Sequence, residues 1–213
     1  MKIDAFCMNE NEIKQDCVAW AEEIAQSYKP DLIIFVAKSG FLFAESIADY
    51  FSCPMAYVIA SRPDNKKKDF LKKIIPVLPK WLILFLLKYK VSQKDYSKKS
   101  NRLIIVPDML RQIKLAEARR ILIIDDSVDT GWSMIQVINT LKENGMGDNY
   151  KIASYAVLTE SKARIKIDYS RYTDTIVLTS TSRYSREYRR FISRYNDWIA
   201  KNANDKRNNQ TNA

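Results

Sequence analysis

Apolar residues along this chain follow two alternating patterns. Short apolar runs, typical of buried strands, are separated by stretches in which apolar residues recur every three or four positions, as on one face of a helix. Strands are predicted over 31–37, 55–60, 103–106, 121–125, 152–158 and 175–179, and helices over 12–28, 41–51, 108–118, 132–142 and 188–202. This alternation predicts an α/β fold with a parallel sheet covered by helices on both faces, and such folds bind ligands beyond the carboxyl ends of the strands.

The pattern fits within one domain. A chain of 213 residues that is 46% hydrophobic can bury one ordinary core. No internal repeat is visible, and the polar residues 203–213 predict a disordered tail. We therefore expect a single domain over residues 1–202, interrupted by one unusual segment at 61–100.

The composition excludes several kinds of chemistry. The chain has no His, so it can build neither a Ser-His-Asp nor a Cys-His nucleophile system, and His cannot hold zinc. Cys7, Cys17 and Cys53 are odd in number and lack metal-ligand spacing, and the first residues lack the charged and apolar regions of a secretory signal. We therefore expect a reduced, cytoplasmic protein whose acids and bases are carboxylates, Lys, Tyr or Cys.

The segment ILIIDDSVDTGWSM (121–134) predicts an anion site. It is a buried strand followed by a short loop and a helix start. Backbone N–H groups from Val128 to Ser133 lack intrahelical partners and, with the helix dipole, attract a phosphate. Thr130 and Ser133 add hydroxyl donors, and Gly131 lets the backbone come close to the ligand.

Two adjacent carboxylates, Asp125 and Asp126, end the strand of this segment. Carboxylates do not suit contact with a phosphate, but they suit sugar hydroxyls or a hydrated Mg²⁺ ion. A sugar phosphate is therefore the ligand that satisfies both halves of the segment.

This segment resembles the phosphoribosyl pyrophosphate (PRPP) signature of the type I phosphoribosyltransferases, in which two acidic residues and a short run precede Asp-Thr-Gly-x-Thr/Ser. The resemblance implies a Rossmann-like parallel sheet flanked by helices and a Mg²⁺-dependent transfer of the 5-phosphoribosyl group of PRPP, with release of pyrophosphate. It assigns the acidic pair, Asp125 and Asp126, to the ribose hydroxyls and, directly or through water, to the metal. The implied PRPP-binding residues of this segment are Asp125, Asp126, Ser127, Val128, Asp129, Thr130, Gly131, Trp132 and Ser133.

Asp129 has a separate implied role. It matches the carboxylate that, in hypoxanthine-type members of the family, lies near the acceptor and is proposed as its general base. Asp129, Asp125 and Asp126 are thus the candidate catalytic residues. Two positions depart from the family pattern, because Ser127 stands where an aliphatic residue is usual and Trp132 where small or basic residues are common. Trp132 is either the edge of a lid or a packing residue.

A second segment supports the resemblance. In the family, a loop after an early strand binds the pyrophosphate through backbone amides and a basic residue, and VAKSGFLFA (36–44) has that form at the expected place. Lys38, Ser39 and Gly40 are therefore implied to contact the leaving pyrophosphate.

The net charge of +10 is concentrated in residues 61–100, which hold twelve Lys or Arg against three Asp. In the family the stretch after the second strand is a mobile loop that closes over PRPP. Arg62, Lys66, Lys67 and Lys68 are candidate lid residues, or else belong to a solvated basic loop.

Residues 70–90 (FLKKIIPVLPKWLILFLLKYK) combine apolar residues with lysines. The uninterrupted apolar run 81–87 is too short to span a bilayer, which takes about 20 residues. Lysines beside Trp, Phe and Leu suit an element that lies on an anionic membrane. The alternative is a hood helix that packs on the core or on a second subunit, so a homodimer also remains open.

Several residues are candidates for contact with the acceptor. Tyr169, Tyr172, Lys162 and Lys166 could serve a purine base but show no recognisable arrangement, and the basic stretch 183–190 suits either an anionic acceptor or the polar side of the last helix. A basic, interfacial insertion favours a hydroxyl of a lipid-linked glycan, as in related enzymes of bacterial surface polysaccharide synthesis, and a peripheral location at the inner face of the cell membrane.

Two alternatives remain open. One is a purine-salvage phosphoribosyltransferase, and the other is a PRPP-sensing regulator of the same fold that binds nucleic acid. A single basic segment on an otherwise nearly neutral chain makes nucleic acid the less favoured partner.

Overall fold

A computed structural model of the protein describes residues 3–61, 78–93, 102–111, 113, 115, 117–162 and 164–210. The expected lid residues Arg62 and Lys66 to Lys68 lie outside the described residues, as does most of the first half of the 70–90 segment.

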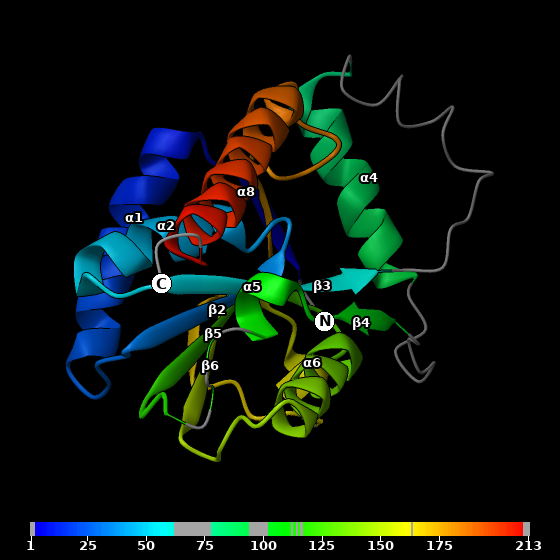
Figure 1. Ribbon diagram of the computed structural model, residues 1–213. Coiled ribbons are helices and arrows are strands. Elements are labelled where there is room, and N and C mark those ends of the chain that lie inside the picture. The colour runs from blue at the N-terminus through cyan, green and yellow to red at the C-terminus, as the bar shows by residue number, and fades with distance from the viewer. Residues whose placement is uncertain are drawn as a thin grey trace.

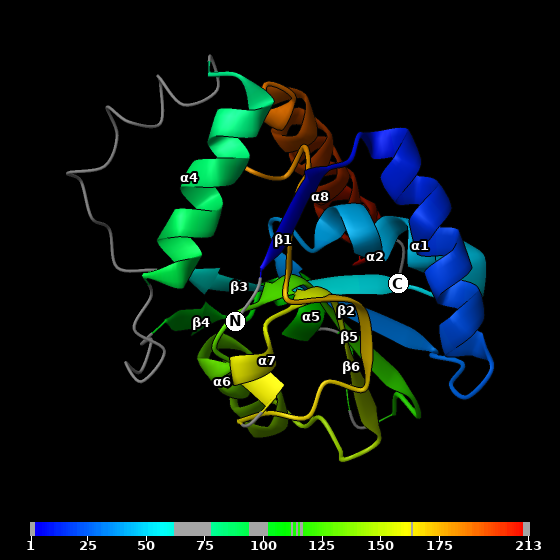
Figure 2. The ribbon, with the colours of Figure 1, turned by 180° about the vertical axis from the view of Figure 1, so that it is seen from behind.

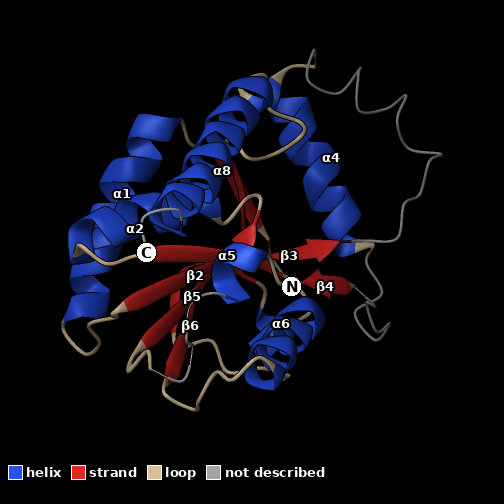
Figure 3. Cartoon of the chain, in the orientation of Figure 1, coloured by secondary structure: helices blue, strands red, loops and turns tan. Residues whose placement is uncertain are grey.

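A six-stranded sheet forms the centre of the molecule (Figure 3). Its strands, in spatial order, are β4 (Leu103–Ile105), β3 (Met55–Ser61), β2 (Leu32–Ala37), β5 (Ile121–Val128), β6 (Tyr150–Val157) and β7 (Tyr169–Thr173). All neighbouring pairs are parallel except β3 and β4. The expected α/β fold with a mostly parallel sheet is confirmed, and its runs of buried residues are typical of strands covered on both faces.

Helices cover both faces of this sheet (Figure 1). On one face lie α1 (Glu10–Ala25), α2 (Phe41–Phe51) and α8 (Tyr188–Gln210). On the other face lie α5 (Asp108–Arg111) and α6 (Trp132–Glu143). A short helix, α7 (Thr159–Lys162), follows β6. The two hydrophobic clusters meet at the central strands β2 and β5, whose alternate side chains point to opposite faces.

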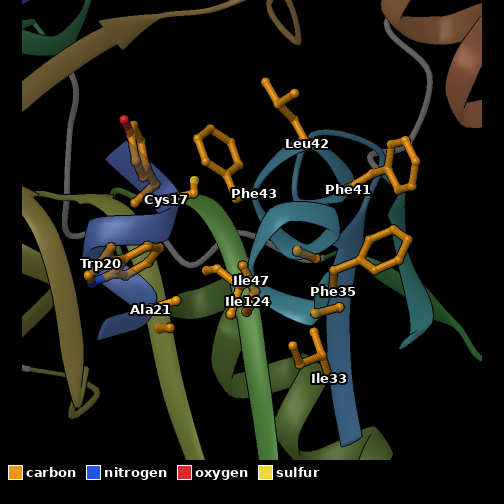
Figure 4. Close-up of a cluster of buried hydrophobic side chains, with 14 of the residues drawn as sticks. Cys17, Trp20, Ala21, Ile33, Phe35, Phe41, Leu42, Phe43, Ile47 and Ile124 are labelled. Carbon is orange, nitrogen blue, oxygen red and sulfur yellow. The ribbon is translucent and has the colours of Figure 1, made fainter. Parts of the chain in front are cut away.

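The cluster under α1 and α2 is rich in aromatic rings (Figure 4). Phe35 of β2 contacts Phe41 and Trp198, with ring centroids 5.7 and 5.5 Å apart. Phe43 of α2 lies 4.3 Å from the ring of Tyr155 on β6. These contacts fix α2, and with it the loop that precedes α2, against the carboxyl half of the sheet.

Local capping sets the start of α1. Asn9 accepts hydrogen bonds from the backbone N–H groups of Asn11 and Glu12, and the Glu12 side chain accepts one from the backbone N–H of Asn9. This reciprocal capping box starts the helix at Glu10.

A second sheet of two parallel strands, β1 (Asp4–Cys7) and β8 (Thr175–Leu178), stands beside the main sheet. The helix α4 (Lys80–Ser92) packs on both of its strands (Figure 2). The described part of the 70–90 segment therefore includes a hood helix over β1 and β8. Among the described helices, none is long and apolar enough to cross a membrane.

Several predicted elements need correction. The strand at 175–179 belongs to the small sheet rather than the main one, because it pairs with β1. The helix predicted over 108–118 ends at Arg111, and the strand at 103–106 is antiparallel. The strands β1 and β7 were not predicted, because β1 is only four residues long and β7 is too polar to form an apolar run. The helix α8 continues to Gln210, beyond the end expected at residue 202, while the division into a domain 1–202 and a tail stays a prediction.

Candidate active site

The two sequence-predicted loops meet at the carboxyl edge of the main sheet. β2 and β5 are adjacent and parallel, so the loop after β2 and the loop after β5 leave the sheet side by side (Figure 1). A Cβ atom at Gly40 would lie 2.7 Å from the carbonyl oxygen of Val36 and 3.1 Å from that of Ile124, the residue before Asp125. The loop after β2 therefore rests directly on the strand that carries the acidic pair.

Residues 38–40 form a tight turn into α2. The backbone N–H of Gly40 donates to the carbonyl oxygen of Val36 at 3.1 Å, and that of Phe41 donates to Lys38 at 3.1 Å. The Ala37–Lys38 peptide bond is cis. Lys38 is exposed and its ammonium group lies 6.0 Å from the centre of the Tyr195 ring, while Ser39 is half-buried. This basic turn is accessible to an anion at the sheet edge.

The acidic pair lies inside β5, because the strand continues to Val128 rather than ending at Asp125. Asp125 is 9% exposed, and its carboxylate accepts a hydrogen bond from the backbone N–H of Asp126 at 2.9 Å. Burial and the negative charge of Asp126 raise the pKa of Asp125 well above its usual range. Burial also raises the pKa of Asp126; hydrogen bonding to Asp125 opposes this, and the charge of Asp129 adds to it. The strand end thus places two neighbouring carboxyl groups where burial disfavours their charged forms.

Arg102 is a neighbour of the acidic pair that sequence reasoning missed. Its positive charge opposes the rise in the pKa of both Asp125 and Asp126. Its backbone N–H donates to the Gln136 side chain of α6 at 3.1 Å, which fixes this part of the chain beside the start of α6. Arg102 lies some twenty residues from the motif in sequence, and the pairing of β3 with β4 together with the contact to α6 brings it there.

The phosphate half of the motif has the expected geometry. Gly131 has φ of 78°, a left-handed conformation that favours glycine, and α6 begins at the next residue. No side chain of the described residues caps the start of α6. Thr130 and Ser133 are half-buried beside it, and the exposed Ser127 stands at the outer end of β5. The first N–H groups of α6 therefore remain suited to an anion.

Trp132 packs under the segment that follows α7. The guanidinium carbon of Arg164 lies 5.7 Å from the centre of the Trp132 ring. A Cβ atom at Gly131 would lie 2.8 Å from a methyl group of Ile165. Trp132 thus packs against this segment, and the contact brings the positive charge of Arg164 next to the predicted phosphate loop.

A cavity of about 130 Å³ adjoins the acidic residues. Asp126, Ser127 and Asp129 form one wall of it. The rest is largely apolar and comes from distant segments, with Phe43 of α2, Val91 of α4, Tyr155 and Val157 of β6, and Ile176 and Val177 of β8 among its lining residues. The candidate general base Asp129 therefore faces a small, aromatic-lined space.

The sequence candidates for purine contact do not line this cavity. Tyr169 is hydrogen-bonded to Ser27 at 2.8 Å, and the Tyr172 hydroxyl donates to Asp16 at 3.2 Å. Lys166 pairs with Asp168 at 3.4 Å on the surface. The Lys162 side chain lies outside the described residues.

The acidic pair fits a Mg²⁺ ion by the chemistry of its donors. Mg²⁺ is commonly held by one or two carboxylates together with substrate phosphates and water. Burial and neighbouring carboxylates raise the pKa values of Asp125 and Asp126, and a divalent cation beside them would favour their charged forms. Within the described residues, no cluster of three or more Cys, Asp or Glu forms a protein-only metal site.

Together these features define a phosphate-binding α/β protein with an acidic, metal-compatible centre. A sequence profile of the phosphoribosyl transferase domain matches residues 9–184. The chain therefore belongs to the phosphoribosyltransferase family, and it is an enzyme of that class. No curated protein matches it significantly.

Solved structures share the fold. A purine phosphoribosyltransferase from Pyrococcus horikoshii is 20% identical, with a TM-score of 0.56, and the match covers 83% of this chain and 93% of that one. A xanthine-guanine-hypoxanthine phosphoribosyltransferase from Helicobacter pylori is 12% identical, with a TM-score of 0.56 and coverage of 88% and 99%. A Neisseria gonorrhoeae protein solved with bound ppGpp is 14% identical, with a TM-score of 0.53 and coverage of 84% and 90%.

Proposed function

We propose that this enzyme transfers the 5-phosphoribosyl group of PRPP to a ring nitrogen of a purine-class base, and that the base occupies the cavity beside Asp129. The observation that carries the acceptor is this cavity, which is small, largely apolar and partly aromatic, and has a carboxylate in its wall. An apolar cavity of about 150 Å³ holds benzene. A partly open space of about 130 Å³ therefore suits a flat heterocycle better than a sugar, whose hydroxyls need many polar partners.

The loops after β2 and β5 support PRPP as the donor. The half-buried Thr130 and Ser133 and the first N–H groups of α6 suit the 5-phosphate, and Asp125 and Asp126 suit the ribose hydroxyls. The turn Lys38–Gly40 suits the pyrophosphate, since it offers a cation and the backbone amides of Lys38 and Ser39 at the same sheet edge. Arg164, beside the phosphate loop, adds positive charge.

In the proposed reaction, the bond between ribose C1 and the pyrophosphate oxygen breaks, and the electron pair leaves with pyrophosphate. A bond forms between C1 and the base nitrogen, with inversion at C1, and Asp129 accepts the proton of that nitrogen. The Lys38 side chain and the backbone amides of Lys38 and Ser39 stabilise the charge on the departing pyrophosphate. A Mg²⁺ ion held by Asp125 and Asp126 would supply further charge neutralisation.

The second candidate is the one that the sequence favours, a hydroxyl of a lipid-linked glycan. One structural observation supports it, because α4, which contributes Val91 to the cavity, also exposes several apolar side chains. A lipid-linked acceptor would then meet the active site at the end of α4.

Release of pyrophosphate from PRPP and Mg²⁺ tests the proposal, with purine bases in one set of reactions and synthetic or lipid-linked glycans in another. Release with a purine supports the main proposal, and release only with a glycan replaces it by the second candidate. PRPP binding without release in either set would indicate a PRPP-sensing regulator.

Two substitutions separate the proposed roles. Asp129→Asn should lower kcat by at least about a hundredfold while PRPP binding changes little, because general-base catalysis typically contributes that much. Thr130→Ala should weaken PRPP binding more than it lowers kcat, because it removes a phosphate donor. Calorimetric titration with PRPP and steady-state kinetics measure both quantities. Equal losses of both quantities in both variants would contradict this division of roles.

A further inference from the structure

The helix α4 has an exposed apolar stripe. Trp81, Phe85 and Tyr89 follow each other at intervals of four on one side of the helix and are 69%, 62% and 60% exposed. Leu86, beside them, is 41% exposed, whereas Ile83 on the packed side is buried. Single exposed apolar residues are ordinary, but a row of large ones on one helix marks an interaction surface. These four residues are called the α4 stripe below.

Positive charge surrounds the α4 stripe. The helix carries Lys80, Lys88 and Lys90 and no acidic residue. The ammonium group of Lys90 lies 6.0 Å from the centre of the Tyr184 ring, so the basic stretch 183–190, with four Arg and one Glu, adjoins the end of α4. Figures 1 and 2 both show α4 beside the start of α8, which that stretch enters. These two segments are far apart in the sequence, and the fold joins them into one basic face.

The positive charge around the α4 stripe decides between two possible occupants, a second subunit and an anionic lipid surface. In a two-fold dimer the same patch of both subunits meets, so Lys80, Lys88 and the basic stretch 183–190 of one subunit would enter the same interface as those of the other, which brings like charges together. An anionic lipid surface instead attracts each of these groups. Trp and Tyr are also the aromatic residues that favour the membrane interface, because their rings are apolar and their N–H and O–H groups stay near water.

We propose that the α4 stripe docks this enzyme on an anionic lipid bilayer. Trp81, Phe85 and Tyr89 enter the boundary between headgroups and acyl chains, and the surrounding Lys and Arg side chains contact lipid phosphates. Val91, just after the stripe, lines the cavity of the candidate active site, so docking holds that cavity near the lipid surface. The inference does not depend on which acceptor the enzyme uses.

Sedimentation of the full-length protein with vesicles tests the inference. Phosphatidylcholine vesicles with and without phosphatidylserine are compared at low and high salt. The protein should pellet with the anionic vesicles, and less of it should pellet at high salt because salt screens the lysines. The triple variant Trp81→Ser, Phe85→Ser, Tyr89→Ser should lower the partition coefficient at least about tenfold, because three interfacial aromatic side chains are lost.

The matched control is Tyr50→Ser, which removes an aromatic side chain that is 42% exposed on α2, away from the α4 stripe. It should leave vesicle binding unchanged. Circular dichroism and PRPP binding establish that each variant is folded.

Absence of vesicle binding by the wild type, or equal binding by wild type and triple variant, overturns the proposal. A dimeric wild type that becomes monomeric in the triple variant, without vesicle binding, assigns the stripe to a second copy instead. None of these results alters pyrophosphate release with a purine, which tests the proposed function separately.

Discussion

At the scale of single residues, Gly40 is a position where the proposed pyrophosphate turn leaves no room for a side chain. A Cβ atom there would meet the backbone oxygens of Val36 and Ile124, which belong to central strands and cannot move aside. Gly40→Ala should therefore cost about 1–3 kcal/mol of stability and displace the turn. We expect PRPP affinity to fall at least about tenfold, measured by titration calorimetry.

Gly147→Ala is the control for this substitution, because a Cβ atom at Gly147 meets nothing within 4 Å. It should leave both the urea midpoint and PRPP affinity unchanged. Unaltered PRPP affinity in a folded Gly40→Ala protein would show that the turn does not bind the donor.

Residue chemistry explains which parts of the site were predictable. Asp125, Thr130 and Gly131 lie in one continuous motif, whose spacing is visible in the sequence and whose geometry the structure bears out, although their binding roles stay predictions. Arg102 and Arg164 could not be predicted, because strand pairing and loop packing bring them to the motif from distant segments. Neither residue carries a local signal that distinguishes it from other surface arginines.

At the scale of elements, a polar network joins α1 to β6 and β7. The Asp16 carboxylate accepts hydrogen bonds from Tyr155 at 2.7 Å, from Tyr172 at 3.2 Å, and from two nitrogens of Arg171 at 3.0 and 2.6 Å. Burial alone would raise the pKa of Asp16, but these donors outweigh it and lower the pKa below its usual 3.8. Asp16 is therefore ionised in the folded protein, where it holds the cavity residue Tyr155 in place.

This network predicts how stability depends on pH. Because the pKa of Asp16 is lower in the folded than in the unfolded state, its contribution is complete above the unfolded value and is lost as the pH falls through the folded value. Asp16→Asn should cost about 1–3 kcal/mol at neutral pH, and the gap to wild type should narrow below about pH 4. Urea unfolding of both proteins across this range measures the gap.

Glu23→Gln serves as the control, since Glu23 also pairs with Arg171 but its side chain is 57% exposed. It should cost less than Asp16→Asn and show little pH dependence. A gap between wild type and Asp16→Asn that stays constant down to pH 3 would contradict the assigned role of Asp16.

Burial decides which elements could be predicted. The strands β2, β3, β5 and β6 form apolar runs because both faces of the sheet are covered, and all four were predicted. The strands β1 and β7 have polar or half-buried residues and leave no such run. Nothing local in β8 separates it from a strand of the main sheet, since its assignment depends on the pairing with β1.

At the scale of the whole molecule, the candidate acceptor cavity is formed by elements that lie far apart in the sequence. Its lining comes from α2, α4, β6, β8 and the end of β5, so no single segment predicts it. The donor loops, by contrast, lie at the edge of β2 and β5 alone. Donor and acceptor binding should therefore be separable by a substitution in the wall that α4 contributes.

Val91→Phe is that substitution. The added ring should fill much of the cavity of about 130 Å³, which raises the KM for the acceptor at least about tenfold while PRPP affinity stays unchanged. Val91→Ala enlarges the same space and should weaken acceptor binding only slightly, which separates blocking from a general disturbance of α4. Steady-state kinetics with the acceptor identified by pyrophosphate release, together with PRPP titration, make both measurements. If Val91→Phe lowers PRPP affinity as much as acceptor affinity, α4 covers the donor rather than the acceptor, and the base must bind elsewhere at the sheet edge.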